Sequence, residues 1–416
     1  MGLLDKLFSK KTPKTNYINL DLSLGNNVLL SGNSPRGKSC VIRNYTISAL
    51  NEGGGCIIIK NAKAGFQAVP NICSSNHAVY GIDLGDDAFT EQFNPFSGLN
   101  EQQTVELLFN LFHKYSEFEN SHKMKFKQYL AKLVFFMKAA GKTVKLNELQ
   151  DYTLEKLEDM NARSRLTSQQ KDQNERFFDS LRQDISILES YFYDFANNNI
   201  GFTMSGNKSL EEIVNSGKVL EINLDFATRK EESELFLTIL ADKLCKFDFN
   251  KTTKSCLTVV VDEIPNETLL KAQFERVISG ASNQVYIVYS ILDIATISEK
   301  TNVYVDCADS LFFFQQNSVK NKNYCADFFG KYDKEKVSTT TTRGYSRGSS
   351  SSYSSSYGGG SSYGGGSNSS SSSSSGRTVT TEKDYVYQPD EFGTLSDTQC
   401  IYFFKWQQSH NYLTLN

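Results

Sequence analysis

Apolar residues recur along this chain with two different periods, and the order of the two predicts the fold class. Short apolar runs, typical of strands buried on both faces, lie at residues 26–30, 56–60, 77–84, 218–224, 256–263, 283–290 and 309–316. Stretches with helical spacing alternate with them, at residues 39–50, 209–215 and about 231–247. Ser209 and Glu212 have the spacing of a capping box. This alternation predicts an α/β domain with a mostly parallel sheet.

Residues 101–199 break the alternation, because only helical periods occur there. Two stretches place apolar residues on one helical face, at Val105, Leu108, Leu111, Phe112 and Tyr115, and at Phe177, Phe178, Leu181, Ile185, Leu188, Phe192 and Phe195. We therefore predict an all-helical domain inserted into the α/β domain. Its lysines, at positions 123, 125, 127, 132, 138, 142 and 145, either contact phosphate or form a solvated face. The interspersed acidic and polar residues favour the solvated face.

The C-terminal part of the chain changes composition twice. Residues 337–380 are mainly Thr, Ser, Gly and Tyr, which cannot bury a core, so we predict a disordered linker. Within residues 381–416 only 400–406 has a strand pattern, and this tail is too short to fold alone, so we expect it to dock on the α/β domain. The predicted division is an N-terminal arm (1–25), two α/β segments (26–100 and 200–336) around the helical insertion (101–199), the linker and the tail.

Composition narrows the classes of protein that fit this chain. The 416 residues carry a net charge of −3, so no overall positive charge indicates nucleic-acid binding. Eight scattered cysteines without a C-x-x-C pair favour a reduced cytosol over a disulfide framework or a metal site. No apolar run is as long as a membrane span, and no signal peptide is visible. The start, "MGLLDKLFSKK", either touches a membrane surface or frays, and fraying is favoured, so we expect a cytoplasmic protein with peripheral membrane contact as the alternative.

The strongest chemical signal is "LLSGNSPRGKSCVIRNY" (29–45), in which a short strand leads through G-x-x-x-x-G-K-S into a helix. Such a loop holds the phosphates of a nucleotide on backbone N–H groups, while its lysine reaches the β- and γ-phosphates and its serine holds Mg²⁺. We predict that ATP and Mg²⁺ bind here, with Ser39 as a metal ligand. The predicted binding residues are Gly32, Asn33, Ser34, Pro35, Arg36, Gly37, Lys38, Ser39 and Cys40. Pro35 has no N–H, so it removes one possible phosphate donor.

A second signal lies about 220 residues further on, where the apolar run "CLTVVVDEIP" ends in Asp262 and Glu263. Open α/β sheets bind their ligands at the carboxyl ends of the strands. In P-loop enzymes an aspartate at this place helps to hold Mg²⁺, and a following glutamate can polarise the attacking water. We therefore predict Asp262 as a metal ligand, and Glu263 and Lys38 as catalytic residues.

Taken together, these motifs resemble the FtsK–HerA superfamily of ring ATPases, and most closely the TraG/TraD-like conjugative coupling proteins of type IV secretion. The resemblance rests on "VLLSGNSPRGKS", "CIIIKNAKAGF", "FNPFSGL", "SLEEIVNSGKVLEINL", "VDCADSLFFFQQNSVKNKNYCADFFG" and "YQPDEFGTLSD", in this order. Several positions depart from the family pattern. Asn61 stands where aspartate is usual, although Lys63 is kept; Ser290 stands where a glutamine ends the strand; and Arg276 is the nearest candidate for a usual arginine. Because no apolar run is long enough, we also expect no transmembrane anchor of the kind that many coupling proteins have.

The resemblance implies a P-loop NTPase of RecA-like fold that hydrolyses ATP between the subunits of a ring, usually a hexamer, and moves DNA in conjugation or mobile-element transfer. It also implies possible contact with membrane-associated secretion components. Two alternatives stay open: a secretion or assembly ATPase that acts on protein cargo, and a nucleotide-binding scaffold that hydrolyses little ATP.

Overall fold

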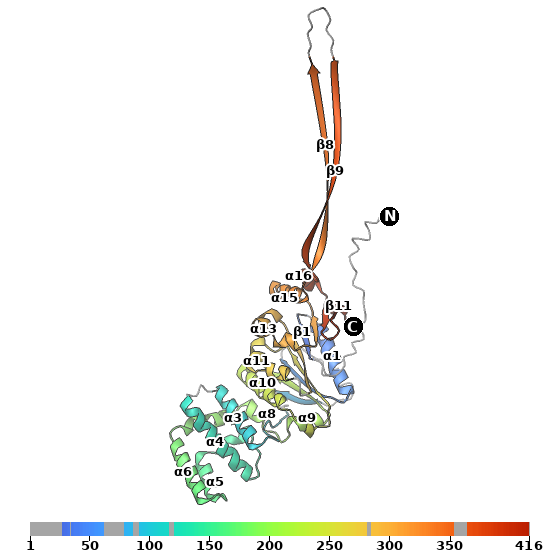
Figure 1. The fold of residues 1–416 in the computed structure, drawn as a ribbon. Helices are drawn as coiled ribbons and strands as arrows, with labels where there is room; N and C mark the ends of the chain where they lie inside the picture. The colour runs from blue at the N-terminus through green and yellow to red at the C-terminus, as the bar shows by residue number, and fades with distance from the viewer. Residues whose placement is uncertain are drawn as a thin grey trace, which may run out of the picture. The chain divides into compact units, whose positions relative to one another are not determined.

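The computed structural model describes residues 27–33, 35–61, 79–85, 91–115, 120–280, 284–352 and 364–415. Its centre is a nine-stranded sheet with the strand order β11-β10-β7-β1-β6-β5-β2-β4-β3 (Figure 1). The strands are β1 (Val28–Ser31), β2 (Gly55–Asn61), β3 (Val79–Asp83), β4 (Val219–Leu224), β5 (Leu257–Asp262), β6 (Val285–Ile291), β7 (Ser310–Phe313), β10 (Gln399–Phe404) and β11 (Ser409–Thr414). All neighbours from β7 through β1, β6, β5, β2 and β4 to β3 pair in parallel. β10 is antiparallel to both of its neighbours, β7 and β11. The predicted α/β fold class is confirmed.

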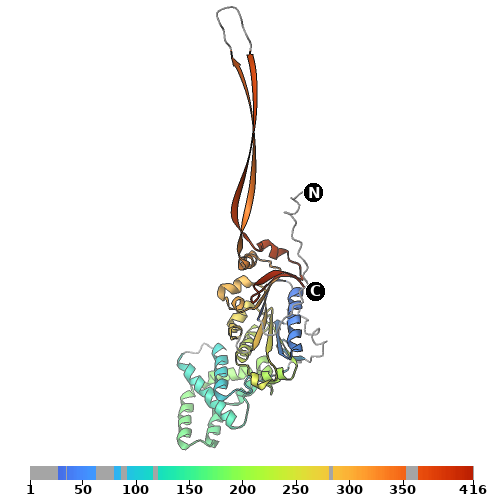
Figure 2. The same cartoon turned by 45° about the vertical axis from the view of Figure 1, so that its right-hand side comes forward.

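Helices cover both faces of the sheet, as Figure 2 shows for α1 on one side and α10 to α13 on the other. These helices are α1 (Pro35–Asn51), α9 (Leu210–Asn215), α10 (Lys230–Cys245), α11 (Asn266–Lys271), α12 (Glu275–Ser279), α13 (Ile294–Lys300), α14 (Val303–Asp306) and α15 (Val319–Phe329), with a 3-10 turn, η3 (Phe249–Lys251). α1 packs Val41, Ile42 and Tyr45 into the core formed with β1 and its neighbours. All six residues of β5 are buried, because the strand lies between two covered faces.

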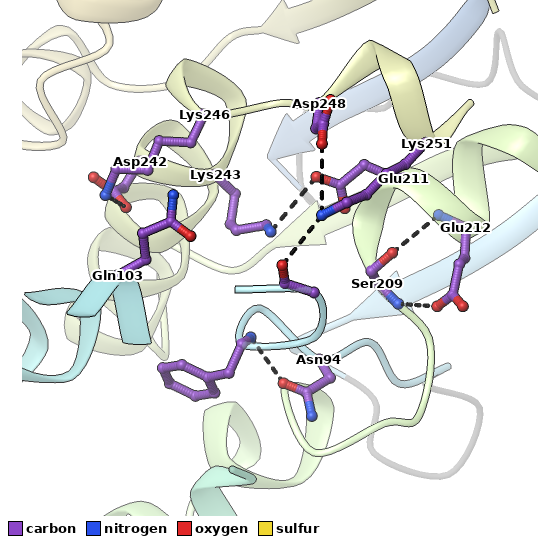
Figure 3. Close-up of polar contacts among 12 residues, drawn as sticks. Asn94, Gln103, Ser209, Glu211, Glu212, Asp242, Lys243, Lys246, Asp248 and Lys251 are labelled. Atoms are coloured by element: carbon purple, nitrogen blue, oxygen red, sulfur yellow. Dashed lines mark hydrogen bonds and ion pairs between the residues drawn. The ribbon is translucent and has the colours of Figure 1, made fainter. Parts of the chain in front are cut away.

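The capping box predicted from the spacing of Ser209 and Glu212 is present at the start of α9. The Ser209 hydroxyl accepts a hydrogen bond from the Glu212 N–H at 3.1 Å, and the Glu212 carboxylate accepts one from the Ser209 N–H at 2.6 Å (Figure 3). One strand was expected near residues 400–406, whereas the structure has two, β10 and β11. β11 was missed because "SHNYLT" is mostly polar and has no apolar strand pattern. Its pairing with β10 stabilises the strand instead.

The predicted helical insertion is present as α3 (Glu101–Tyr115), α4 (Asn120–Ala139), α5 (Leu154–Arg163), α6 (Ser168–Leu181), α7 (Ile185–Ala196) and α8 (Asn199–Thr203), with one 3-10 turn, η2 (Leu146–Asp151). Aromatic side chains hold it together: the Phe112 ring lies 5.2 Å from those of both Phe192 and Phe195, centroid to centroid. None of the helices that the structure describes is both long and apolar enough to cross a membrane.

The chain enters the insertion through residues 93–99, and polar contacts hold this entrance against the α/β domain (Figure 3). Lys251 Nζ donates to the Gly98 carbonyl at 3.1 Å, and the Asn94 side chain accepts from the Phe96 N–H at 2.8 Å and donates to the Val144 carbonyl at 2.9 Å. Nearby, Lys243 and Glu211 form an ion pair of 3.6 Å with almost no exposed surface. Removal of either partner would leave a buried charge, so this pair fixes α9 against α10.

Residues 323–391 form a second compact unit, apart from the unit of residues 1–322 and 392–416. Within it β8 (Lys331–Ser352) and β9 (Gly364–Tyr385) pair as a long antiparallel hairpin. The boundary between the two units falls within the helix that follows, α16 (Pro389–Thr394). The sequence predicted a disordered linker at 337–380, so the structure differs from this prediction over the described residues. The reason is that the ladder consists of backbone hydrogen bonds, which require no apolar side chains, and ion pairs such as Lys334–Asp384 cross it; the described side chains of the hairpin from 333 to 349 are exposed.

Candidate functional site

The two sequence signals meet at the carboxyl edge of the sheet. Parallel pairing puts the ends of β1 and β5 on the same edge, one strand apart, with β6 between them. Lys38 in the first turns of α1 and Glu263 directly after β5 form an ion pair, with 3.1 Å between Lys38 Nζ and Glu263 Oε1. Residues separated by 225 positions in the sequence are thus in direct contact, and the two motifs lie at one place.

The backbone of the loop is held by its neighbours on the sheet edge. The Gly32 N–H donates to the Ile291 carbonyl at the end of β6 at 3.0 Å, and the Asn33 N–H donates to the Gln315 carbonyl at 2.9 Å. Gly32 has a φ of +121°, which glycine adopts far more readily than other residues. α1 begins at Pro35, and proline is well tolerated at the first helical position because the N–H it lacks would have no intrahelical partner. Ser34 lies outside the described residues, as do the N-terminal arm and Lys63.

Burial controls the electrostatics of the three charged residues. Lys38 is 2% exposed and Asp262 is 4% exposed, whereas Glu263 is 25% exposed on its side chain. Burial raises the pKa of Asp262 to about 6, and the nearby Lys38 and Ser290 partly offset this rise. Asp262 Oδ1 is buried and has no hydrogen-bond partner among the described residues. A buried carboxylate oxygen without a partner is costly, which is consistent with a place reserved for a cation.

The oxygen atoms of Ser39 and Asp262 fit the preference of Mg²⁺ for oxygen ligands. Mg²⁺ in phosphate-transfer sites takes one or two protein ligands and completes its shell with waters and phosphate oxygens. Within the described residues no group of three or more His, Cys, Asp or Glu side chains forms an all-protein metal site. Ser39 and Asp262 are therefore the residues that would hold a Mg²⁺ ion bound together with a nucleotide.

Glu263 has a backbone conformation that is unfavourable for any residue other than glycine. Its φ is +53°, in the left-handed region that costs non-glycine residues about 1–3 kcal/mol and that is concentrated at functional sites. In this conformation its carboxylate lies beside Lys38. The structure therefore retains a strained residue at the one place where the proposed catalytic glutamate is needed.

The structure places two of the residues that depart from the family pattern, Ser290 and Arg276. Ser290 lies at the end of β6, opposite Leu30 of β1, so it occupies the strand end between the phosphate loop and Asp262. Arg276 lies on α12, where it lines a cavity of about 410 Å³ together with Asp242 and Cys245 near the last turn of α10. Its guanidinium donates to Gln273 at 3.3 Å, and no contact with Lys38 or Asp262 is found among the described residues. Arg276 therefore does not contribute to this site within one chain.

Sequence reasoning missed one residue at this edge, Gln316. It follows β7, the other neighbour of β1, and its buried side-chain amide donates to Ser31 Oγ at 3.3 Å. The available signal was the pair of glutamines that ends the apolar run "SLFFFQQ". The pattern could not show that β7 lies beside β1.

Comparison with known proteins identifies solved structures that have a similar fold. No protein-family model matches the chain, and no curated protein matches it. Among solved structures, the plasmid coupling protein TrwB in complex with the non-hydrolysable GTP analogue GDPNP is 12% identical, with a TM-score of 0.57, over 94% of this chain and 86% of that chain. TrwB in complex with ADP and Mg²⁺ is also 12% identical, with a TM-score of 0.56, over 94% of this chain and 85% of that chain.

An unbound form of TrwB, described as a bacterial conjugative coupling protein, has a TM-score of 0.55 at 12% identity, over 94% of this chain and 85% of that chain. The chain therefore shares the fold of TrwB, and in this chain that fold is an α/β domain with an inserted helical domain. The resemblance seen in the sequence motifs is confirmed at the level of the fold.

Proposed function

We propose that this chain is a coupling ATPase that uses ATP hydrolysis to move nucleic acid during conjugative or mobile-element DNA transfer. The observation that carries the proposal is the convergence of Lys38, Asp262 and Glu263 at the carboxyl edge of β1 and β5. The fold adds support, since it is shared with TrwB in its complexes with GDPNP and with ADP and Mg²⁺.

The residues divide the chemistry between them. Backbone N–H groups at the start of α1, from Arg36 to Ser39, bind the phosphates, because the Gly32 and Asn33 N–H groups already donate to carbonyls on the sheet edge; Lys38 contacts the β- and γ-phosphates. The oxygen of a water molecule attacks the γ-phosphorus, the bond from this phosphorus to the β–γ bridging oxygen breaks, and Glu263 accepts a proton from the water. Ser39 and Asp262 would hold Mg²⁺, which neutralises charge that develops on the phosphate oxygens.

The Lys38–Glu263 ion pair adds a step to this scheme. In this proposal ATP binding draws Lys38 from Glu263, which it contacts at 3.1 Å, to the γ-phosphate, so that Lys38 exchanges one anionic partner for another. The exchange releases the Glu263 carboxylate to bind the attacking water. ATP binding itself thus prepares the base for hydrolysis.

The lysines of the helical insertion bear on which cargo the chain moves. Some of the insertion's lysines are engaged within the protein: Lys125 pairs with Asp184 and Lys127 with Glu106. Lys138 donates to the Leu99 carbonyl. These contacts favour a solvated and structural role for the lysines, so DNA would be bound by residues that a ring of subunits brings together. The same contacts make protein cargo the second candidate.

ATP hydrolysis measured over a range of protein concentrations, with single-stranded DNA, with double-stranded DNA and without DNA, tests the proposal. We expect the turnover per chain to rise with protein concentration, because the active site is completed between subunits, and to rise further with DNA. Turnover that rises with concentration but ignores both DNAs would favour protein cargo. ATP binding without turnover under every condition would support the scaffold and refute the motor.

A further inference from the structure

The turn that follows β7, residues 314–316, touches both glycines of the phosphate loop. A Cβ atom on Gly32 would lie 2.6 Å from the Gln315 carbonyl oxygen and 2.8 Å from Gln316 Nε2. One on Gly37 would lie 2.5 Å from the Phe314 ring. Side chains do not approach this closely, so only glycine fits at either position. The turn and the loop therefore form one closely packed unit.

Gln316 supplies the polar part of this contact. It is 1% exposed, and its Nε2 donates both to Ser31 Oγ at 3.3 Å and to the Phe314 carbonyl at 3.0 Å. Its Oε1 has no hydrogen-bond partner among the described residues. Buried amide groups are normally satisfied, and an unsatisfied one in a native structure calls for a functional explanation. An apolar side chain of the same length would fill the space without this penalty.

The C-terminal segment holds the turn from the other side. The Gln316 N–H donates to the Phe392 carbonyl at 2.8 Å, and Gln315 Nε2 donates to the Gly393 carbonyl at 3.2 Å. The same segment reaches the loop directly, because the Asp397 carbonyl oxygen lies 2.8 Å from where a Cβ on Gly37 would be. Residues 392–397 thus contact the phosphate loop both directly and through the turn.

We propose that Gln316 is a positioning residue for the nucleotide site, and that together with residues 392–397 it holds Ser31 and Gly32 in the conformation that binds phosphate. Gln316 fixes the loop where β1 ends, just before the N–H groups that face the nucleotide. The proposal rests on the proposed function, since it takes residues 32–39 as the nucleotide loop. It assigns a role in ATP binding to a residue and a segment outside the sequence motifs.

The test compares Gln316→Met, Ser31→Ala and the double variant in the full-length protein, by calorimetric ATP binding, steady-state hydrolysis and thermal unfolding. Gln316→Met keeps the length of the side chain and removes its donor. We expect the Kd for ATP to rise about five- to tenfold, as for the loss of one buried hydrogen bond. KM should rise in parallel, while kcat changes less than about threefold, because the catalytic groups are retained.

The double variant shows whether the two side chains act together. Because both substitutions remove the same hydrogen bond, the double variant should bind ATP within about twofold of Gln316→Met. Gln407→Met, a change at an exposed glutamine on the β10–β11 turn, is the matched control and should leave the Kd unchanged.

An unchanged Kd in Gln316→Met, or a lower melting temperature with an unchanged Kd, would overturn the proposal, and so would fully additive effects in the double variant. If Gln316→Met does not fold, Ser31→Ala alone decides: its Kd must rise at least about threefold. Lys38→Ala, measured in parallel, distinguishes a failure of the positioning role from a failure of the nucleotide site. Loss of binding in Lys38→Ala with none in Gln316→Met refutes only the positioning role, whereas unchanged binding in Lys38→Ala refutes the nucleotide site itself.

Discussion

Replacing Glu263 with glutamine should separate ATP binding from ATP hydrolysis. Glu263 follows the buried strand β5, is one quarter exposed, and contacts Lys38 at 3.1 Å. Glutamine keeps the size of the side chain and an oxygen that can accept a hydrogen bond. It removes the negative charge that accepts a proton from water and that attracts Lys38. The fold should be unaffected, because the side chain lies outside the core.

Two effects on the site follow from the loss of charge. Without a general base, turnover should fall by about a hundredfold or more, which corresponds to about 2.7 kcal/mol in activation free energy. The contact with Lys38 also weakens, since the ion pair with a carboxylate becomes a hydrogen bond from the charged lysine to a neutral amide oxygen. Lys38 is then released to the phosphates more easily. The Kd for ATP should therefore stay equal or fall by up to about fivefold.

Calorimetric ATP binding, phosphate release and sedimentation of the wild type and Glu263→Gln measure these effects. Glu267→Gln, four residues away and exposed on α11, is the matched control and should behave as the wild type. ATP trapped between subunits should also shift Glu263→Gln towards the ring, because a ligand stabilises the state that binds it better. Loss of binding together with hydrolysis would mean that Glu263 is structural, and normal hydrolysis would mean that another residue activates the water. Tight binding without a change in assembly would argue against a site between subunits.

Two further predictions concern stability. Glu211→Gln leaves Lys243 buried without its anionic partner, and burial already lowers the pKa of Lys243, so the free energy of unfolding should fall by about 3 kcal/mol in chemical denaturation. Lys246→Gln, which breaks the more exposed pair with Asp242, should cost less than about 1 kcal/mol, and equal losses would contradict this reasoning. In the β8–β9 hairpin, amide hydrogens of residues 338–352 and 364–376 should exchange long before those of β5, because no packed core protects the ladder. Exchange as slow as in β5 would show that the hairpin is stabilised by contacts beyond its own backbone pairing.

The sequence was sufficient wherever a local pattern determined the structure. The unbroken apolar run of β5 predicted a central strand, and parallel topology then required Asp262 to end at the edge that carries Lys38. The role of Gln316 could not be predicted, because it depends on β7 lying beside β1. No short sequence motif specifies the order of strands in a sheet. Arg276 illustrates the same limit. Its nearness in sequence to the expected position suggested a role, but α12 carries it towards the end of α10.

The contact between Lys38 and Glu263 could not be predicted, although each of the two residues could. Each residue was predicted for its role with nucleotide, and their mutual ion pair follows only from the distance between them in the structure. The hairpin of β8 and β9 is a related case, since its composition predicts no buried core while its backbone still forms a ladder. In both cases the pairing depends on chain geometry that residue types alone do not specify.

ATP binding and turnover in Lys38→Ala, compared with the wild type, test the central claim most directly. Lys38 is buried beside Glu263 and Asp262, and the account gives it the contact with the β- and γ-phosphates. Removing one such preorganised contact should cost about 3 kcal/mol or more at the transition state, so turnover should fall by at least a hundredfold while the circular dichroism spectrum stays that of the wild type. A well-folded Lys38→Ala protein that still binds and hydrolyses ATP at the wild-type rate would contradict the assignment of residues 32–39 as the ATP site.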